Sequence, residues 1–131
     1  MAREVIQTGN APKAIGPYSQ GIKAEGRYVF VSGQLGLDPA TGQLQEGIEA
    51  QSRQALENIK NILENAGASL SNVVRSMVLL KSMSDFQALN QIYGTFFAEN
   101  PPARVTFGGL ELPLGALVEI GRARRAAATF A

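Results

Sequence analysis

The amino-acid sequence predicts a two-layer α+β domain, a mixed β-sheet with two helices on one face, from three observations. A chain of 131 residues with 45% hydrophobic content suits one compact domain over residues 1–131 and leaves no room for a second. Two segments carry apolar residues at helical spacing, and short runs rich in β-branched and aromatic residues surround them. These segments alternate in the order β-β-β-α-β-α-β-β, which favours one sheet layer and one helix layer.

The first third of the chain reads as strands and turns. Residues 3–8 predict a short strand, and residues 10–20, with two prolines and a glycine, predict an ordered loop. Residues 19–26 and 27–36 carry β-branched and aromatic side chains on either side of Glu25-Gly26, so they predict a β-hairpin. A second turn follows at residues 37–44, where Asp-Pro and Thr-Gly occur.

The hydrophobic period becomes helical after Gly47, and Gly67 predicts the end of this first helix. The helical stripe consists of Ile48, Ser52, Ala55, Leu56, Ile59, Ile62, Leu63 and Ala66. Residues 72–83 form the most apolar run, which is too short for an ordinary buried helix and therefore predicts a central strand.

A second amphipathic helix is predicted to begin with a capping box of Ser84 and Gln87 and to stop before Pro101-Pro102. Its apolar stripe consists of Phe86, Leu89, Tyr93, Phe96 and Phe97. Two last strands are expected at residues 103–110 and 116–128. If the free face of the resulting sheet is apolar, it needs a cover, so we expect an oligomer in which sheets pack on one another.

Composition and charge restrict the partners. Twelve basic and eleven acidic residues give a net charge of +1, which supplies no electrostatic reason to expect nucleic acid or an anionic membrane as partner. The one basic cluster, Arg122, Arg124 and Arg125, is more typical of a solvated face than of a phosphate track. No apolar run approaches the ~18 residues of a membrane span and no signal peptide is visible, so we expect a cytoplasmic protein.

The chain has no cysteine and no histidine. This absence excludes disulfides, thiolate nucleophiles, the usual zinc ligands and the usual general base near neutral pH. Any chemistry has to come from carboxylates, Lys, Arg, Tyr, hydroxyls, backbone groups or positioned water, and no cofactor or metal is expected.

Arg104 is the first candidate site residue. Strand alternation puts Arg104 and Thr106 on one face and Val105 and Phe107 on the other, and we expect the apolar pair to face the core. If residues 111–115 close an antiparallel hairpin, Arg104 lies opposite Glu119. The two then form either an ordinary cross-strand salt bridge, which spacing alone favours, or a carboxylate clamp beside an acid that holds a water.

Four other residues are weaker candidates. Tyr18 either anchors its proline-rich loop to the core or reaches a site. Ser32 and Gly33 interrupt an apolar strand, which indicates a bulge, a close backbone approach or a hydroxyl aimed at a ligand. Asn90 is polar on an apolar helix stripe and needs a hydrogen-bond partner.

Several segments, in order and spacing, resemble the Rid family of reactive intermediate deaminases, also called the YjgF family. These are APKAIGPYSQG, YVFVSGQLGLDPATGQL, the stretch from QSRQALENIK to IYGTFF, and PPARVTF followed by LVEI. The resemblance runs from about residue 9 to residue 120. It implies a chorismate-mutase-like fold and a homotrimer whose sheets form a central barrel, with a site in each cleft between subunits.

The resemblance also implies an activity and its residues. Family members with the arginine hydrolyse 2-imino or enamine acids, such as 2-iminobutanoate and 2-iminopropanoate, to 2-oxo acids and ammonia without a cofactor. Arg104 falls on the carboxylate clamp and Glu119 on the acid that positions the attacking water. The residues expected to line the pocket are Tyr18, Ser32 with Gly33, Asn90 and Thr106.

The sequence departs from the family where many relatives have cysteine and this chain has Thr106, so the backbone N–H there is expected to assist binding rather than the side chain. Two other functions stay open. One is the ribonuclease or translation-inhibitor role attached to some members, for which only Glu119 or Lys and Tyr remain as acid-base groups. The other is a protein that binds a 2-oxo or amino acid without turnover.

Overall fold

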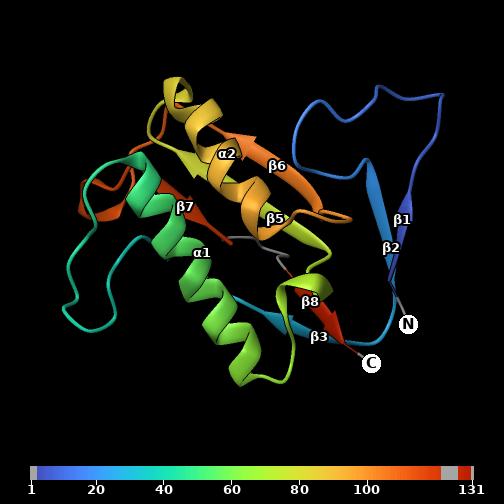
Figure 1. Ribbon diagram of the computed structural model, residues 1–131, viewed down its shortest axis with the longest axis horizontal. Helices are drawn as coiled ribbons and strands as arrows, with labels where there is room; N and C mark the ends of the chain where they lie inside the picture. Colours follow the sequence, from blue (N-terminus) through green and yellow to red (C-terminus); the bar gives the residue numbers. More distant parts are fainter. Residues whose placement is uncertain (1–2, 122–126, 131) are drawn as a thin grey trace.

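The computed structural model describes residues 3–121 and 127–130 and contains a four-stranded sheet with two α-helices on one face (Figure 1). The strand order is β4 (Gln34–Leu35), β7 (Val118–Ile120), β5 (Arg75–Leu80) and β6 (Ala103–Phe107). β5 and β6 are parallel and the other neighbours are antiparallel, so the sheet is mixed. The predicted α+β class is confirmed, as is the central place of the 72–83 strand.

The helices α1 (Ile48–Asn65) and α2 (Phe86–Phe96) cover the sheet because alternate residues of β5 and β7 are apolar toward them. The core joins Leu56 and Leu63 of α1 and Leu89 of α2 to alternate strand residues such as Val78 and Ile120. Burial of this kind contributes about 25 cal/mol per Å² of apolar surface. The stripe predicted for the first helix is therefore the face that binds it to the sheet.

The predicted hairpin between residues 19–26 and 27–36 is wrong. Its strands exist as β2 (Gly21–Ala24) and β3 (Arg27–Phe30), but β2 pairs with β1 (Arg3–Ile6) and β3 with β8 (Ala127–Phe130). A type I′ turn needs positive φ at both central residues. Gly26 has a φ of 130° and Glu25 is not a positive-φ residue, so the chain bends here out of one sheet into another.

The expected strand 27–36 is divided. β3 ends at Phe30 and β4 begins at Gln34, and the chain between them, which includes Ser32 and Gly33, is irregular. The two halves belong to different sheets. The interruption predicted from Ser32 and Gly33 is thus a change of pairing partner.

The second turn and the limits of α1 follow the sequence. Asp38 N–H donates to Gln43 O at 2.9 Å and Gly42 N–H to Asp38 O at 2.7 Å, closing the 37–44 turn. Gly67 has a φ of 83° and follows the end of α1. Only glycine adopts that conformation without cost, which is why the helix stops there.

The capping box predicted for the second helix does not form. Asp85 is the N-cap residue of α2 and makes no side-chain cap, and a 3₁₀ turn, Met83–Asp85, precedes it. Ser82 caps that turn through its Oγ, which accepts the Ser84 N–H at 3.2 Å, and the Ser84 hydroxyl bonds the Ser82 hydroxyl at 2.7 Å. The Ser84 side chain therefore bonds Ser82 within the 3₁₀ turn and does not cap α2.

The sheet face opposite the helices carries Met77, Val105 and Phe107, of which Phe107 is 50% exposed. Packing of this face against other copies stays a prediction. The basic cluster Arg122, Arg124 and Arg125 lies outside the described residues. Neither helix described by the structure combines the length and the apolar character that a bilayer crossing requires.

Candidate active site

Arg104 projects from β6 toward α2. β6 pairs in parallel with β5 so that Arg104 stands beside Ser76, and paired residues share one face of a sheet. Ser76 is buried and bonds a residue of α2, so this is the helix-covered face. The alternation predicted for this strand is confirmed, but its assignment is wrong: Phe107 faces outward and Arg104 faces the helices.

Aromatic rings surround the Arg104 guanidinium. Its Cζ lies 4.9 Å from the ring centroid of Tyr93 and 5.6 Å from those of Tyr18 and Phe86. Nη1 donates to Asn90 Oδ1 at 2.8 Å. The partner expected for Asn90 is therefore Arg104 itself. Because rings attract a cation through their faces, these contacts hold the charge without neutralising it.

No carboxylate pairs with Arg104 anywhere in residues 3–121 or 127–130. Burial lowers the pKa of Arg104 from its ordinary value, and the Tyr93 and Tyr18 hydroxyls oppose this change. An arginine stays protonated at neutral pH even so. A guanidinium has five N–H donors and Asn90 takes one, so the site offers a partly buried positive charge with donors to spare.

Tyr18 reaches Arg104 because its loop is tied to the start of β6. Ser19 donates its N–H to Pro102 O at 3.0 Å and its hydroxyl to Pro101 O. The Tyr18 hydroxyl accepts the Ile15 N–H at 3.3 Å, so the ring also anchors its own loop. The structure is consistent with both roles of Tyr18, as an anchor of its loop and as a site residue.

Glu119 does not lie opposite Arg104, so the predicted hairpin is wrong. β5 separates β6 from β7, and Glu119 aligns with Leu79, three residues along β5 from Ser76. An odd offset along a strand means opposite faces. The two backbones are also more than about 10 Å apart. Within one chain, Arg104 and Glu119 cannot contact the same small ligand.

The connection after β6 explains this outcome. Its 3₁₀ turn, Pro113–Gly115, carries the chain past the end of β5, where Leu110 N–H donates to Leu80 O at 3.3 Å and Lys81 N–H to Leu117 O at 3.0 Å. The chain thus crosses over β5 instead of reversing beside β6. Glu119 is 8% exposed, and its carboxylate has no hydrogen bond or ion pair within the described part of the chain.

Ser32 and Gly33 lie on the far side of β5 from Arg104. The Ser32 carbonyl is next to Gly121, whose N–H donates to Met77 O at 3.0 Å. Thr106, by contrast, shares the face of Arg104, and its buried Oγ1 has no hydrogen-bond partner among the described residues. The structure therefore brings Tyr18, Asn90, Arg104 and Thr106 to one side of the sheet and leaves Ser32, Gly33 and Glu119 apart from them.

Phe86 and Tyr93 belong to the apolar stripe predicted for the second helix, and both contact the Arg104 guanidinium. A signal was present, because Phe86, Asn90 and Tyr93 fall at helical positions i, i+4 and i+7. A polar amide between two aromatic side chains on one stripe indicates a buried polar partner.

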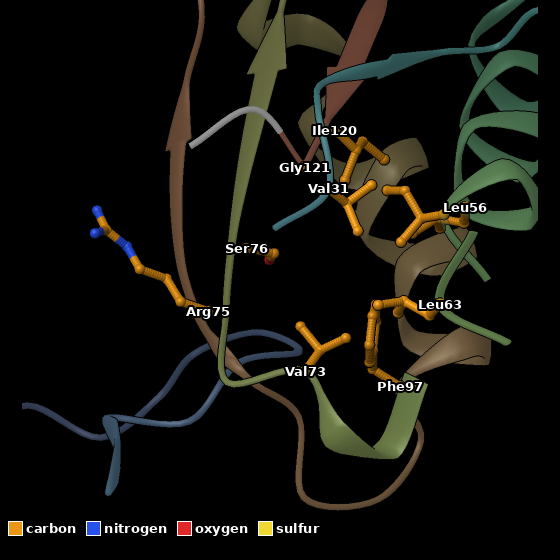
Figure 2. A pocket seen from close by; sticks show the side chains of 10 residues that line it. Val31, Leu56, Leu63, Val73, Arg75, Ser76, Phe97, Ile120 and Gly121 are labelled. Carbon is orange, nitrogen blue, oxygen red and sulfur yellow. The ribbon is translucent and has the colours of Figure 1, made fainter. Parts of the chain in front are cut away.

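A separate cavity between α1 and the sheet is apolar and small (Figure 2). Its volume is about 30 Å³, room for about one water molecule. Ile59, Leu63 and Phe97 are among its lining residues, and the Arg75 side chain points away from it (Figure 2). It is a packing defect of the core and cannot hold an organic acid.

Comparisons with known proteins show which family the chain resembles. A family model described as endoribonuclease L-PSP matches residues 8–123. A RutC family protein of Pyrococcus horikoshii is 52% identical over 119 residues, which cover 90% of this chain and 94% of that protein. A human protein named 2-iminobutanoate/2-iminopropanoate deaminase is 44% identical over 121 residues, covering 92% of this chain and 88% of that one.

Solved structures share the fold. RidA from the Antarctic bacterium Psychrobacter sp. PAMC 21119 superimposes with a TM-score of 0.74 at 44% identity, covering 97% of this chain and 99% of that one. Escherichia coli TdcF with bound serine has a TM-score of 0.74 at 34% identity, covering 98% and 99%. With a family match over most of its length and these relatives, the chain belongs to the YjgF/RidA family.

Proposed function

We propose that this protein is a cofactor-free deaminase that hydrolyses 2-imino acids and their enamine tautomers, such as 2-iminobutanoate and 2-iminopropanoate, to 2-oxo acids and ammonia. The observation that carries the proposal is the Arg104 guanidinium, partly buried and without a carboxylate partner among the described residues. Relatives at 44–47% identity bear the name of this activity.

Arg104 binds the substrate carboxylate through two parallel N–H···O bonds, the geometry in which a guanidinium recognises a planar carboxylate. Such charge-assisted bonds are about twice as strong as neutral ones. The two bonds also fix the position of the reacting C=N carbon, because that carbon is bonded directly to the carboxylate. Thr106, two residues along β6, offers its backbone N–H and its unpartnered hydroxyl to the same ligand.

The chemistry needs only a placed water. Water adds its oxygen to the C=N carbon while the imine nitrogen takes up a proton, and the resulting carbinolamine expels ammonia as the C=O bond forms. A protonated imine is already electrophilic, so orientation supplies much of the rate acceleration. A carboxylate that accepts a proton from the water assists as general base.

We assign that carboxylate to Glu119 of a second copy of the chain. Glu119 is nearly buried, has no hydrogen-bond partner among the described residues and lies on the sheet face opposite its own Arg104. A site assembled between copies, in a homotrimer, supplies both residues to one ligand, and also brings in Ser32 and Gly33, which lie across β5 from Arg104.

A binding protein that senses a 2-oxo or amino acid is the second candidate, because TdcF, a relative of this chain, is described with bound serine. Calorimetric titration with 2-oxobutanoate and with its methyl ester measures the clamp without turnover. We expect the wild type to bind the acid at least about 100-fold more tightly than the ester, and Arg104→Ala to lose this preference.

Imine hydrolysis measured on the same preparations separates the two functions. A deaminase binds 2-oxobutanoate and accelerates imine hydrolysis, whereas a sensor binds and leaves the rate unchanged. Equal affinity of the wild type for acid and ester would contradict the clamp itself.

A further inference from the structure

We propose that the ring of Tyr93, fixed by the hydrogen bond between its hydroxyl and Ser76, is the platform that orients the Arg104 guanidinium for its ligand. The inference rests on the proposed function, since it concerns the same clamp. Tyr93 acts through Arg104 and touches no ligand, so it is a positioning residue.

Tyr93 links the three elements that meet at Arg104. It belongs to α2 and is 0% exposed, and its hydroxyl forms a 2.5 Å hydrogen bond with Ser76 Oγ on β5. Ser76 is the register partner of Arg104 on β6. The phenol therefore spans from the helix to the strand directly beside the arginine, and its ring lies under the guanidinium at 4.9 Å.

The Tyr93 ring has little freedom of its own. Phe97 packs on it with the two ring centroids 4.7 Å apart, and the Ser76 bond holds its far end. A ring fixed at both sides is a rigid support for a cation over its face. Asn90 holds Nη1, and the Phe86 ring lies 5.6 Å from Cζ, so the guanidinium has three contacts from α2 and its remaining N–H donors keep one direction.

Tyr93 is not an acid-base group in this site. Burial raises the pKa of Tyr93 to about 12, an effect that the Ser76 hydrogen bond and the Arg104 charge only partly oppose. The phenol is therefore neutral at any pH at which the protein would be assayed. What remains is the position and the electrostatic attraction of the ring.

The test compares three variants. Tyr93→Leu removes the ring, Tyr93→Phe keeps it without the hydroxyl, and Phe97→Leu is the matched control, a core aromatic that packs on Tyr93 and has no contact with Arg104 in the described residues. We expect Tyr93→Leu to raise the Kd for 2-oxobutanoate and the KM for the imine roughly tenfold or more. Its kcat should change much less, because the water and the substrate stay in place once bound.

Tyr93→Phe keeps the ring and loses the Ser76 bond that fixes it, so we expect its Kd to lie between those of the wild type and Tyr93→Leu. Phe97→Leu loosens the Tyr93 ring without removing it, so it should lower the melting temperature about as much as Tyr93→Leu but raise Kd by no more than about threefold. Unchanged Kd in a folded Tyr93→Leu variant, or a Kd rise in Phe97→Leu as large as in Tyr93→Leu, would overturn the proposal.

If Tyr93→Leu does not fold, an NMR measurement on the wild-type protein tests the proposed platform. The Arg104 Nε–H resonance, assigned by its loss in Arg104→Lys, should be shifted upfield by the ring below it and should report slow rotation of the guanidinium. A free-rotating guanidinium without ring shift would refute the platform. This readout needs no ligand, so it stands even if the wild type binds no 2-oxo acid and the proposed function fails.

Discussion

At the scale of the residue, the Arg104 guanidinium is held in place without a carboxylate partner among the described residues. Arg104 is surrounded by three aromatic rings and one amide. An internal carboxylate would have satisfied the guanidinium and competed with a ligand for it, whereas rings and an amide orient it and leave its charge available. An arginine that binds an anionic ligand is therefore expected to have rings and amides around it, whereas an arginine in a stable ion pair has a carboxylate.

Substitutions at Asn90 test whether the Arg104 charge binds the ligand. Asn90→Asp places a carboxylate at the oxygen that now accepts from Nη1 at 2.8 Å, so an ion pair should form there. Because that pair neutralises the clamp, we expect the Kd for 2-oxobutanoate to rise at least tenfold, with more loss in Asn90→Asp than in Asn90→Ala. Calorimetry on both variants checks the order. Wild-type affinity in Asn90→Asp would mean that the Arg104 charge does not bind the ligand.

At the scale of the element, the sequence was informative about which segments form helices and strands and uninformative about which strands pair. The period after Gly47 and the apolar run at 72–83 depend on local side chains, and both predictions are confirmed. β3 pairs with β8 about a hundred residues later, and no local turn signal specifies such a partner. The same limit explains why Arg104 does not lie opposite Glu119: β6 and β7 are consecutive in sequence, but β5 lies between them in the sheet.

Gly36 controls how closely β4 approaches α1. A Cβ at Gly36 would lie 2.5 Å from the backbone of Gln51, which cannot move without displacing the helix. We expect Gly36→Ala to lower the free energy of unfolding by about 2 kcal/mol or more. Gly9→Ala is the matched control, since a Cβ there meets nothing within 4 Å, and it should change stability by less than about 0.5 kcal/mol.

Thermal unfolding at one fixed protein concentration checks the pair, because oligomer stability depends on concentration. If Gly36→Ala were as stable as Gly9→Ala, the close packing of β4 on α1 would be wrong.

At the scale of the whole molecule, the residues of the proposed site face away from each other within one chain. Arg104, Asn90 and Tyr18 gather on the helix side, and Glu119 lies on the other face of the sheet. The sequence, through its family resemblance, named all of these residues but could not place them, since their faces depend on the β5–β6 pairing. In the proposed function, a second copy of the chain brings its Glu119 to Arg104.

Mixed oligomers test this assembly. Arg104→Ala and Glu119→Gln should each be inactive alone, since each removes one residue from every site. Co-expressed with two different tags and purified as mixed trimers, they should regain up to about one third of the wild-type activity, because one of the three interfaces in each mixed trimer joins an intact Arg104 to an intact Glu119. Mixed oligomers as inactive as their parents would place both residues in one chain.

The most direct test of the central claim is the hydrolysis of 2-iminobutanoate generated in the assay by an amino acid oxidase, with semicarbazide present to capture the imine. Wild-type protein should lower semicarbazone formation by hydrolysing the imine first, and Arg53→Ala, which alters an exposed arginine of α1, should do the same. Arg104→Ala, in an intact oligomer, should leave semicarbazone formation at the level without enzyme. Full activity in Arg104→Ala would contradict the account.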